Sequence, residues 1–322
     1  MKSGRFEIWP RNGWMVALVW GLAIAGFNLT AAAQEAATLE KPAAAPDPKT
    51  DEASEKKSSN KTEKDLEFVR VLKEGKKPVA LQTANVRYQK PGVVGGPEIT
   101  LIGAVHIGEA TYYSRLNQAF RKFDALLFEM VMDPDMDVPD PEERGVSPVS
   151  TIQTGMKDAL GLTFQLDEID YKANNFVHAD MTPTEFFETM EKRNDGLWNM
   201  MLRSVGSSLA MQSSGQSTGD VALLAGLMSS DREKAMRRAF ADQLQLMDGQ
   251  MAALTDEEGK STLITERNAK AFKVMDRELA AGKKNLGIFY GAGHLKDMHK
   301  RLTEEYGMVP VETEWVSAWD LK

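Results

Sequence analysis

The sequence contains no cysteine and only four histidines among its 322 residues. Without cysteine, the chain has no thiol nucleophile, no disulfide framework and no thiolate ligand for zinc or an iron–sulfur cluster. Any metal must therefore be bound by histidine and carboxylate side chains. The histidines available for this are His106, His178, His294 and His299.

The chain also lacks an excess of positive charge. It has 39 Lys and Arg residues against 47 Asp and Glu residues, so its formal net charge is −8. A nucleic-acid interface needs a basic surface to neutralise phosphates, and we therefore expect no nucleic-acid partner. The hydrophobic content of 42% and the charged content of 27% are typical of a globular protein.

Residues 1–33 have the pattern of a secretory signal peptide. A basic N-terminal segment precedes an apolar run from Trp14 to Phe27, and the small residues Ala31-Ala32-Ala33 follow it. We therefore predict a secreted or periplasmic protein of a bacterial envelope. The apolar run is shorter than the span of about 20 residues that a bilayer requires. The alternative is an uncleaved signal, which would be the chain's only contact with a membrane.

Residues 34–64 are rich in Ala, Pro, Lys, Glu and Ser and contain almost no large apolar side chain. Such a segment cannot offset the entropy of ordering by burial, so we predict a disordered linker. The folded domain is then residues 65–322. Because it has no disulfides, it must be stabilised by a large hydrophobic core, which a domain of this length can form.

The folded part has the pattern of an α/β domain. Residues 99–106 and 125–131 resemble buried strands, and residues 110–123 between them have helical spacing. A β-α-β order favours parallel strands joined by a right-handed crossover. A second unit of this kind lies in residues 285–315. We therefore predict β-α-β units at both ends of the domain around a mixed sheet.

Residues 150–280 are predicted to form a large helical insertion, or cap. Thr182 is a good N-cap residue, and Pro183 and Glu185 complete the sequence of a capping box. Residues 200–251 contain seven of the 18 methionines. Methionine-rich helices form either an adaptable core or a mobile cap that binds varied apolar ligands, and both interpretations stay open.

Two predicted strands end in the same Gly-x-x-His pattern, at Gly103 to His106 and at Gly291 to His294. We expect each glycine to allow a tight turn and each histidine to lie at the carboxyl edge of the sheet, where α/β sheets bind ligands. If the two strands are neighbours, the two imidazoles meet. The alternative is a pair of packing or helix-capping histidines.

Glu129 interrupts an apolar run and is costly to bury unless it is paired or metal-bound. At the same edge it would join His106 and His294 as a ligand of Mn²⁺, Co²⁺ or Zn²⁺. The alternative is an ion pair with Lys or Arg. Arg267 lies in a predicted helix, where it either clamps a substrate oxygen or pairs with Glu129.

Three further side chains complete the candidate site. Glu266 and His178 are candidate general bases, and His178 has Asp180 two positions further on. Tyr290, beside the second Gly-x-x-His segment, is a candidate donor to a developing oxyanion.

At these residues the sequence resembles the TraB/PrgY/GumN/Tiki family, within the wider group of erythromycin-esterase and ChaN-like proteins. The resemblance covers residues 70–320 and rests on Gly103–His106, Phe128–Met130, Glu266–Asn268 and Gly291–His294. It implies an α/β fold in which both Gly-x-x-His segments and the glutamate line one site. Tiki-type members are described as metal-dependent proteases, and other members as inhibitors of peptide pheromone signalling.

The predicted function is therefore an exported, metal-dependent, peptidase-like hydrolase. His106, Glu129 and His294 would hold the metal, and the substrate would be a peptide or a small molecule. Two alternatives remain: a non-catalytic protein that sequesters a peptide or small ligand, and a metal-free esterase that uses histidine as a general base.

Overall fold

The computed structural model describes residues 66–136, 138, 160–193, 229, 231–250 and 260–322. The predicted signal peptide and linker, residues 1–64, lie outside the described residues, and so do large parts of the predicted helical insertion. None of the helices in the described ranges is long and apolar enough to cross a membrane.

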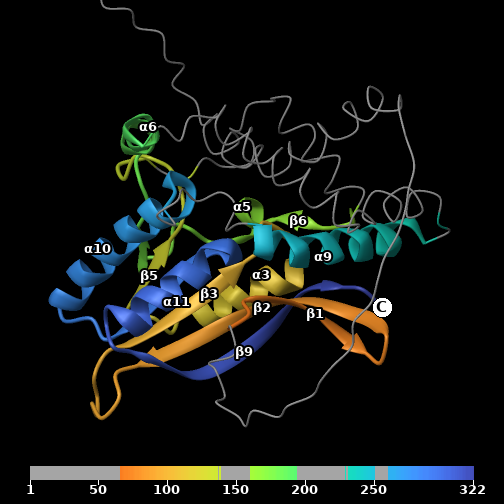
Figure 1. The fold of residues 1–322 in the computed structure, drawn as a ribbon, viewed down its shortest axis with the longest axis horizontal. Coiled ribbons are helices and arrows are strands. Elements are labelled where there is room, and N and C mark those ends of the chain that lie inside the picture. Colours follow the sequence, from red (N-terminus) through yellow and green to blue (C-terminus); the bar gives the residue numbers. More distant parts are fainter. Residues whose placement is uncertain (1–65, 137, 139–159, 194–228, 230, 251–259) are drawn as a thin grey trace, which may run out of the picture.

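A seven-stranded mixed sheet forms the centre of the domain (Figure 1). Its parallel strands lie in the order β3 (Glu98–Ala104), β8 (Asn285–Gly291), β5 (Ala125–Phe128) and β7 (Phe176–His178). The antiparallel strands are β1 (Val69–Glu74), β2 (Lys77–Gln89) and β9 (Val309–Asp320). A separate two-stranded sheet joins β4 (Ile107–Gly108) to β6 (Thr163–Phe164). The predicted α/β fold around a mixed sheet is confirmed.

The order of the strands differs from a simple pair of β-α-β units. Strand β8 lies between β3 and β5, so the two strands of the first unit are parallel but are not neighbours. The last strand, β9, pairs antiparallel with β2 and not with β8. One consequence matters for the site: β3 and β8 are direct parallel neighbours, with Ala104 opposite Gly291. The two Gly-x-x-His segments therefore leave the sheet side by side.

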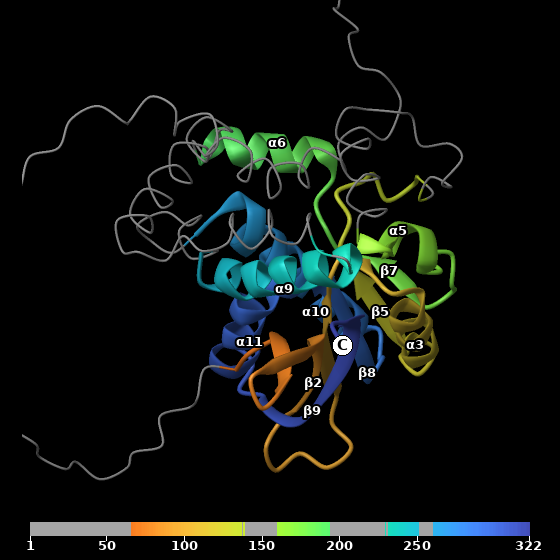
Figure 2. The same cartoon turned by 90° about the vertical axis from the view of Figure 1, so that its right-hand side faces the viewer.

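Helices cover both faces of this sheet (Figure 2). Helices α3 (Ala110–Phe120) and α9 (Arg232–Gln250) belong to one hydrophobic cluster, and α10 (Arg267–Ala280) and α11 (Leu295–Glu304) to the other. Strand β5 shows why both faces need cover. Leu126 and Phe128 belong to the first cluster, and Ala125 and Leu127 belong to the second. A strand buried on both faces must be apolar throughout.

Helix α6 (Pro183–Lys192) begins with the predicted capping box. The Thr182 side chain accepts a hydrogen bond from the Glu185 backbone, and the Glu185 carboxylate accepts one from the Thr182 backbone. The helix lies above the carboxyl edge of the parallel strands (Figure 2).

Three short helical segments complete the fold: α5 (Gln165–Glu168), the π-helical η4 (Thr262–Glu266) and the 3₁₀-helical η5 (Ala292–His294). Segment η4 leads directly into α10, and η5 leads from β8 into α11. Both segments end at the carboxyl edge of the sheet.

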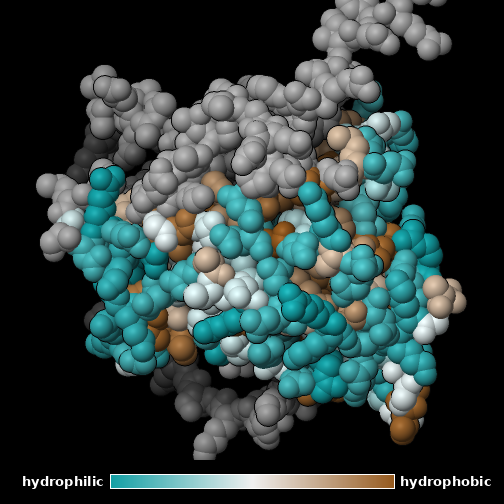
Figure 3. All heavy atoms as spheres, turned by 180° about the vertical axis from the view of Figure 1, so that it is seen from behind, coloured by the Kyte–Doolittle hydropathy of each residue, from teal (hydrophilic) through white to brown (hydrophobic). Residues whose placement is uncertain are grey.

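The first half of β9 is exposed. Val309 and Val311 are 42% and 44% exposed, whereas Trp319 near the end of the strand is buried. The N-terminal half of the strand lies outside the hydrophobic clusters, and its C-terminal half packs into one of them. Seen from behind, hydrophilic side chains cover most of the described surface, with smaller hydrophobic groups between them (Figure 3).

Candidate functional site

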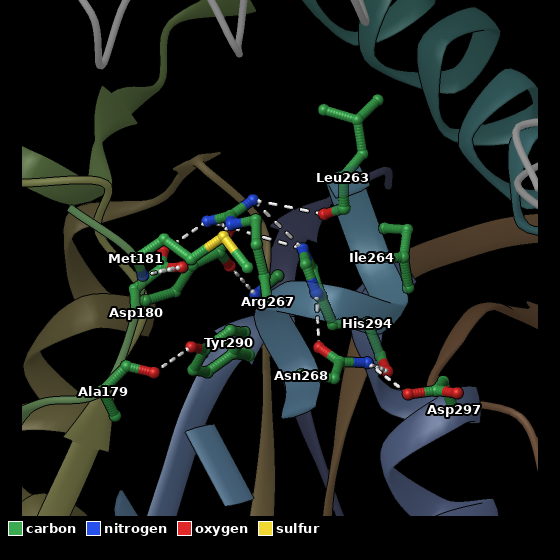
Figure 4. A network of polar contacts seen from close by, with 12 residues as sticks. Ala179, Asp180, Met181, Leu263, Ile264, Arg267, Asn268, Tyr290, His294 and Asp297 are labelled. Atoms are coloured by element: carbon green, nitrogen blue, oxygen red, sulfur yellow. Dashed lines mark hydrogen bonds and ion pairs between the residues drawn. The ribbon is translucent and has the colours of Figure 1, made fainter. Parts of the chain in front are cut away.

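One polar side chain follows the carboxyl end of each parallel strand. His106 lies two residues after β3, and His294 lies three residues after β8. Glu129 comes directly after β5, and Asp180 lies two residues after β7. Because the carboxyl ends of parallel strands lie at one edge, these side chains converge there. Arg267, the first residue of α10, reaches into the same place (Figure 4).

Arg267 lies at the centre of this cluster and is 4% exposed. Its Nε and Nη2 donate to the two carboxylate oxygens of Asp180, at 3.0 and 2.5 Å. Nη2 also donates to Glu129 Oε1 at 2.7 Å. Burial disfavours the charged guanidinium, but Asp180 and Glu129 outweigh this effect and raise the pKa of Arg267 above its ordinary value. The cluster thus contains a permanent buried cation.

Glu129 has partners at both carboxylate oxygens. Oε1 accepts from Arg267 and lies 3.4 Å from His294 Nε2, and Oε2 accepts from the backbone N–H of Gly291 at 2.6 Å. Burial alone would raise the pKa of Glu129. The electrostatic effects of His294 and Arg267 outweigh burial and hold this pKa well below its ordinary value. Glu129 is therefore ionised at neutral pH.

Gly291 provides the space in which the cluster forms. A Cβ atom at this position would lie 3.2 Å from Glu129 Oε2 and 3.2 Å from His106 Nε2. The backbone φ of Gly291 is −51°, a value that any residue adopts. The conformational freedom of glycine is therefore not needed at this position. Glycine is required here because two polar side chains approach the backbone closely.

Asn268 determines which nitrogen of His294 faces the cluster. The Asn268 amide nitrogen donates to the His294 carbonyl at 3.0 Å and to Asp297 Oδ2 at 2.9 Å. Its amide oxygen therefore faces His294 Nδ1, at 2.7 Å. Because a carbonyl oxygen can only accept, Nδ1 carries the hydrogen. Nε2 then faces Glu129 and Arg267 (Figure 4).

His106 completes the set from the other Gly-x-x-His segment. Burial lowers its pKa to about 3; Glu129 opposes this shift, whereas Arg267 and His294 add to it. His106 is therefore neutral at physiological pH. The structure thus brings His106, Glu129 and His294 together with Arg267.

The hydrogen bonds and ion pairs of the other three predicted residues lie elsewhere, although the Tyr290 ring packs edge-on against the His294 ring, with 5.2 Å between the ring centroids. His178 Nε2 bonds the Met130 carbonyl at 2.7 Å, and the Glu266 carboxylate accepts from Arg193 at 3.2 Å. The Tyr290 hydroxyl donates a hydrogen bond to the Ala179 carbonyl at 2.6 Å.

The sequence reasoning assigned no role to Asp180 or Asn268. Asp180, and not His178, faces the cluster and binds Arg267. The signal that could have identified it is its position just after the end of β7, because His106, Glu129 and His294 also follow strand ends. Asn268 follows Arg267 directly, but its function is visible only in the contacts of its amide with His294.

The donor atoms suit a metal in chemistry but not in their present arrangement. A neutral His106 and an ionised Glu129 are in the protonation states that metal ligands require, and His294 directs its Nε2 atom inward. Asn268 also orients His294 as partners of metal-bound histidines do. Within the described ranges, however, no group of three or more His, Asp or Glu residues is placed so that it could hold a metal ion.

Comparison of the chain with family models, with curated proteins and with solved structures finds no match.

Proposed function

We propose that the chain is an exported hydrolase of the TraB/PrgY/GumN/Tiki type that cleaves peptide bonds or related acyl bonds. The observation that supports this most is the convergence of His106, Glu129 and His294 from three neighbouring parallel strands. The signal-like residues 1–33 support export.

In this proposal His106, Glu129 and His294 hold a divalent metal such as Mn²⁺, Co²⁺ or Zn²⁺. The chemistry that such a metal supplies is polarisation of the scissile carbonyl and a lowering of the pKa of bound water to about 7.

The chain's own groups prepare this chemistry. Asn268 keeps His294 Nε2 directed inward, and the N–H of Gly291 orients the Glu129 carboxylate. Among the described residues, the Nη1 group of Arg267 has two contacts, both long at 3.5 Å, with the Leu263 carbonyl and His294 Nε2. It is the part of the guanidinium that has hydrogen-bonding capacity left for a substrate oxygen. A preorganised donor of this kind stabilises the negative charge that develops during hydrolysis.

The test is metal analysis combined with a cleavage assay. The purified protein, His106→Ala and His294→Ala are compared for bound metal, and each is incubated with a peptide mixture with and without Mn²⁺ before mass spectrometry. We expect metal and cleavage in the unmodified protein and loss of both in the two variants. His178→Ala is the matched control, because His178 bonds a backbone carbonyl outside the cluster. Equal and negligible metal content in all proteins would contradict the metal proposal.

A second candidate is a metal-free esterase. The observation that favours it is the contact of Arg267 with Glu129, which places a cation of the chain itself among the donor atoms. In this case His106 acts as the general base, and activity survives chelation by EDTA. Peptide binding without cleavage would instead indicate a sequestering protein.

A further inference from the structure

Arg267 and a divalent metal would compete for the same donor atoms. The guanidinium lies 2.7 Å from Glu129 Oε1 and 3.5 Å from His294 Nε2, and these two donor atoms are 3.4 Å apart. The positively charged guanidinium therefore contacts both donor atoms where Glu129 and His294 face each other. A metal that binds both donors must come within a few ångströms of this charge, which repels it.

Asp180 holds Arg267 in this place. Its side chain is completely buried, and its two oxygens bind Nε and Nη2 of Arg267 in a bidentate pair. One of these oxygens also accepts from the Met181 backbone, which fixes the direction of the carboxylate. A planar, bidentate contact of this type is the strongest that a guanidinium makes with a carboxylate.

We infer that Arg267, anchored by Asp180, is an internal cation that occupies the site when no metal is bound. The inference rests on the proposed metal site and describes how its occupancy is controlled. Metal binding requires the Arg267–Glu129 contact to open, while both contacts with Asp180 remain. The arrangement keeps Glu129 ionised and ordered without metal, and it weakens metal binding relative to the same donors without the arginine.

The inference is tested by calorimetric titration of the full chain with Mn²⁺. The principal variant is Arg267→Met combined with Asp180→Asn, which removes the internal cation together with the buried anion that would otherwise be left unpaired. We expect the dissociation constant for Mn²⁺ to fall at least tenfold in this double variant. Adding His294→Ala should cancel the gain, because the gained affinity depends on the original donors.

Two further proteins make the result specific. Arg267→Gln removes the charge but keeps an amide that can bond Asp180, and it should also tighten Mn²⁺ binding. It replaces the double variant in the titration if the double variant does not fold. Lys283→Met combined with Glu278→Gln removes an ion pair at the other end of α10 and should leave the affinity unchanged.

The outcomes separate the inference from the proposed function. Unchanged or weaker Mn²⁺ binding in the Arg267 variants, with normal binding in the unmodified chain, would overturn the inference and leave the metal site standing. An absence of binding in every protein would overturn both. Binding that appears only after Arg267 is replaced supports the inference directly.

Discussion

Gly291 shows how strongly the site depends on single residues. It leaves room for His106 and Glu129 at the backbone and donates its N–H to the carboxylate. We expect Gly291→Ala to lower metal affinity and activity at least tenfold, because the new methyl group pushes both donors away. A destabilisation of about 1–3 kcal/mol should accompany this overpacking.

Gly103→Ala is the matched control for this change. Its Cβ would meet the Ala84 carbonyl at 3.2 Å and Leu295 at 3.3 Å, so it is equally crowded but does not touch the cluster. Unfolding curves and metal titrations on both variants distinguish the effects. An equal loss of metal affinity in the two variants would mean that Gly291 acts only through stability.

Asn268 gives a second prediction at this scale. Without its amide oxygen, His294 loses the partner that fixes its ring and directs Nε2 toward Glu129. We expect Asn268→Ala to weaken metal binding about 10–100-fold, the usual effect of losing the partner of a metal-bound histidine. Asp297→Asn removes charge from the other side of the same amide and should have a much smaller effect. Equal effects of the two changes in a metal titration would refute this role.

At the scale of elements, α9 is fixed to the domain by one buried arginine. Arg237 donates to the carbonyls of Leu160, Gly161 and Asp320 and to the carboxylates of Glu109 and Glu233. The helix is thereby connected to the C-terminal end of β9 and to the segment that precedes β6.

Replacement of Arg237 by methionine should therefore be costly. It leaves the buried Leu160 carbonyl and several partly exposed acceptors without a donor, and we expect the free energy of unfolding to fall by about 1–3 kcal/mol. Arg232→Met, at the exposed start of the same helix, is the control and should change stability by less than about 0.5 kcal/mol. Chemical denaturation measures both, and similar values for the two variants would contradict the anchoring role.

At the scale of the whole molecule, the cluster makes stability depend on pH. The pKa of His106 is lowered to about 3 from an ordinary value of 6.5, and the pKa of Glu129 is also lowered. In both cases the unfolded chain binds more protons than the folded chain, so stability is lost as the pH falls. For His106 this loss begins below pH 6.5 and continues toward pH 3, at no more than about 1.4 kcal/mol per pH unit.

Chemical denaturation between pH 7 and pH 4 in the presence of EDTA measures this dependence. We expect a smaller slope in His106→Gln than in the unmodified protein, because the variant has no proton to take up on unfolding. His178→Gln serves as the control outside the cluster. A slope that His106→Gln leaves unchanged would show that burial of His106 does not contribute to acid lability.

Local patterns in the sequence were sufficient for the α/β class and for placing His106, Glu129 and His294 at strand ends. They were not sufficient for the meeting of these residues, which depends on the position of β8 between β3 and β5. In each case a short apolar run marks a buried strand, and the first polar groups after it must lie at the sheet edge. The same logic could not separate His178 from Asp180, because β7 is only three residues long and both residues lie near its end. The role of Asn268 depends on the direction of an amide, which no local pattern specifies.

The position of β8 between β3 and β5 determines when the cluster can form during folding. The middle strand of the parallel sheet comes from Asn285–Gly291, far along the chain from both of its neighbours. Pairings over such sequence separations are slow, because the loop must close before any contact is made. A chain that ends before this strand has two open apolar strand edges and neither His294 nor Gly291. The protein therefore remains prone to aggregation and without its site until its C-terminal segment has been inserted.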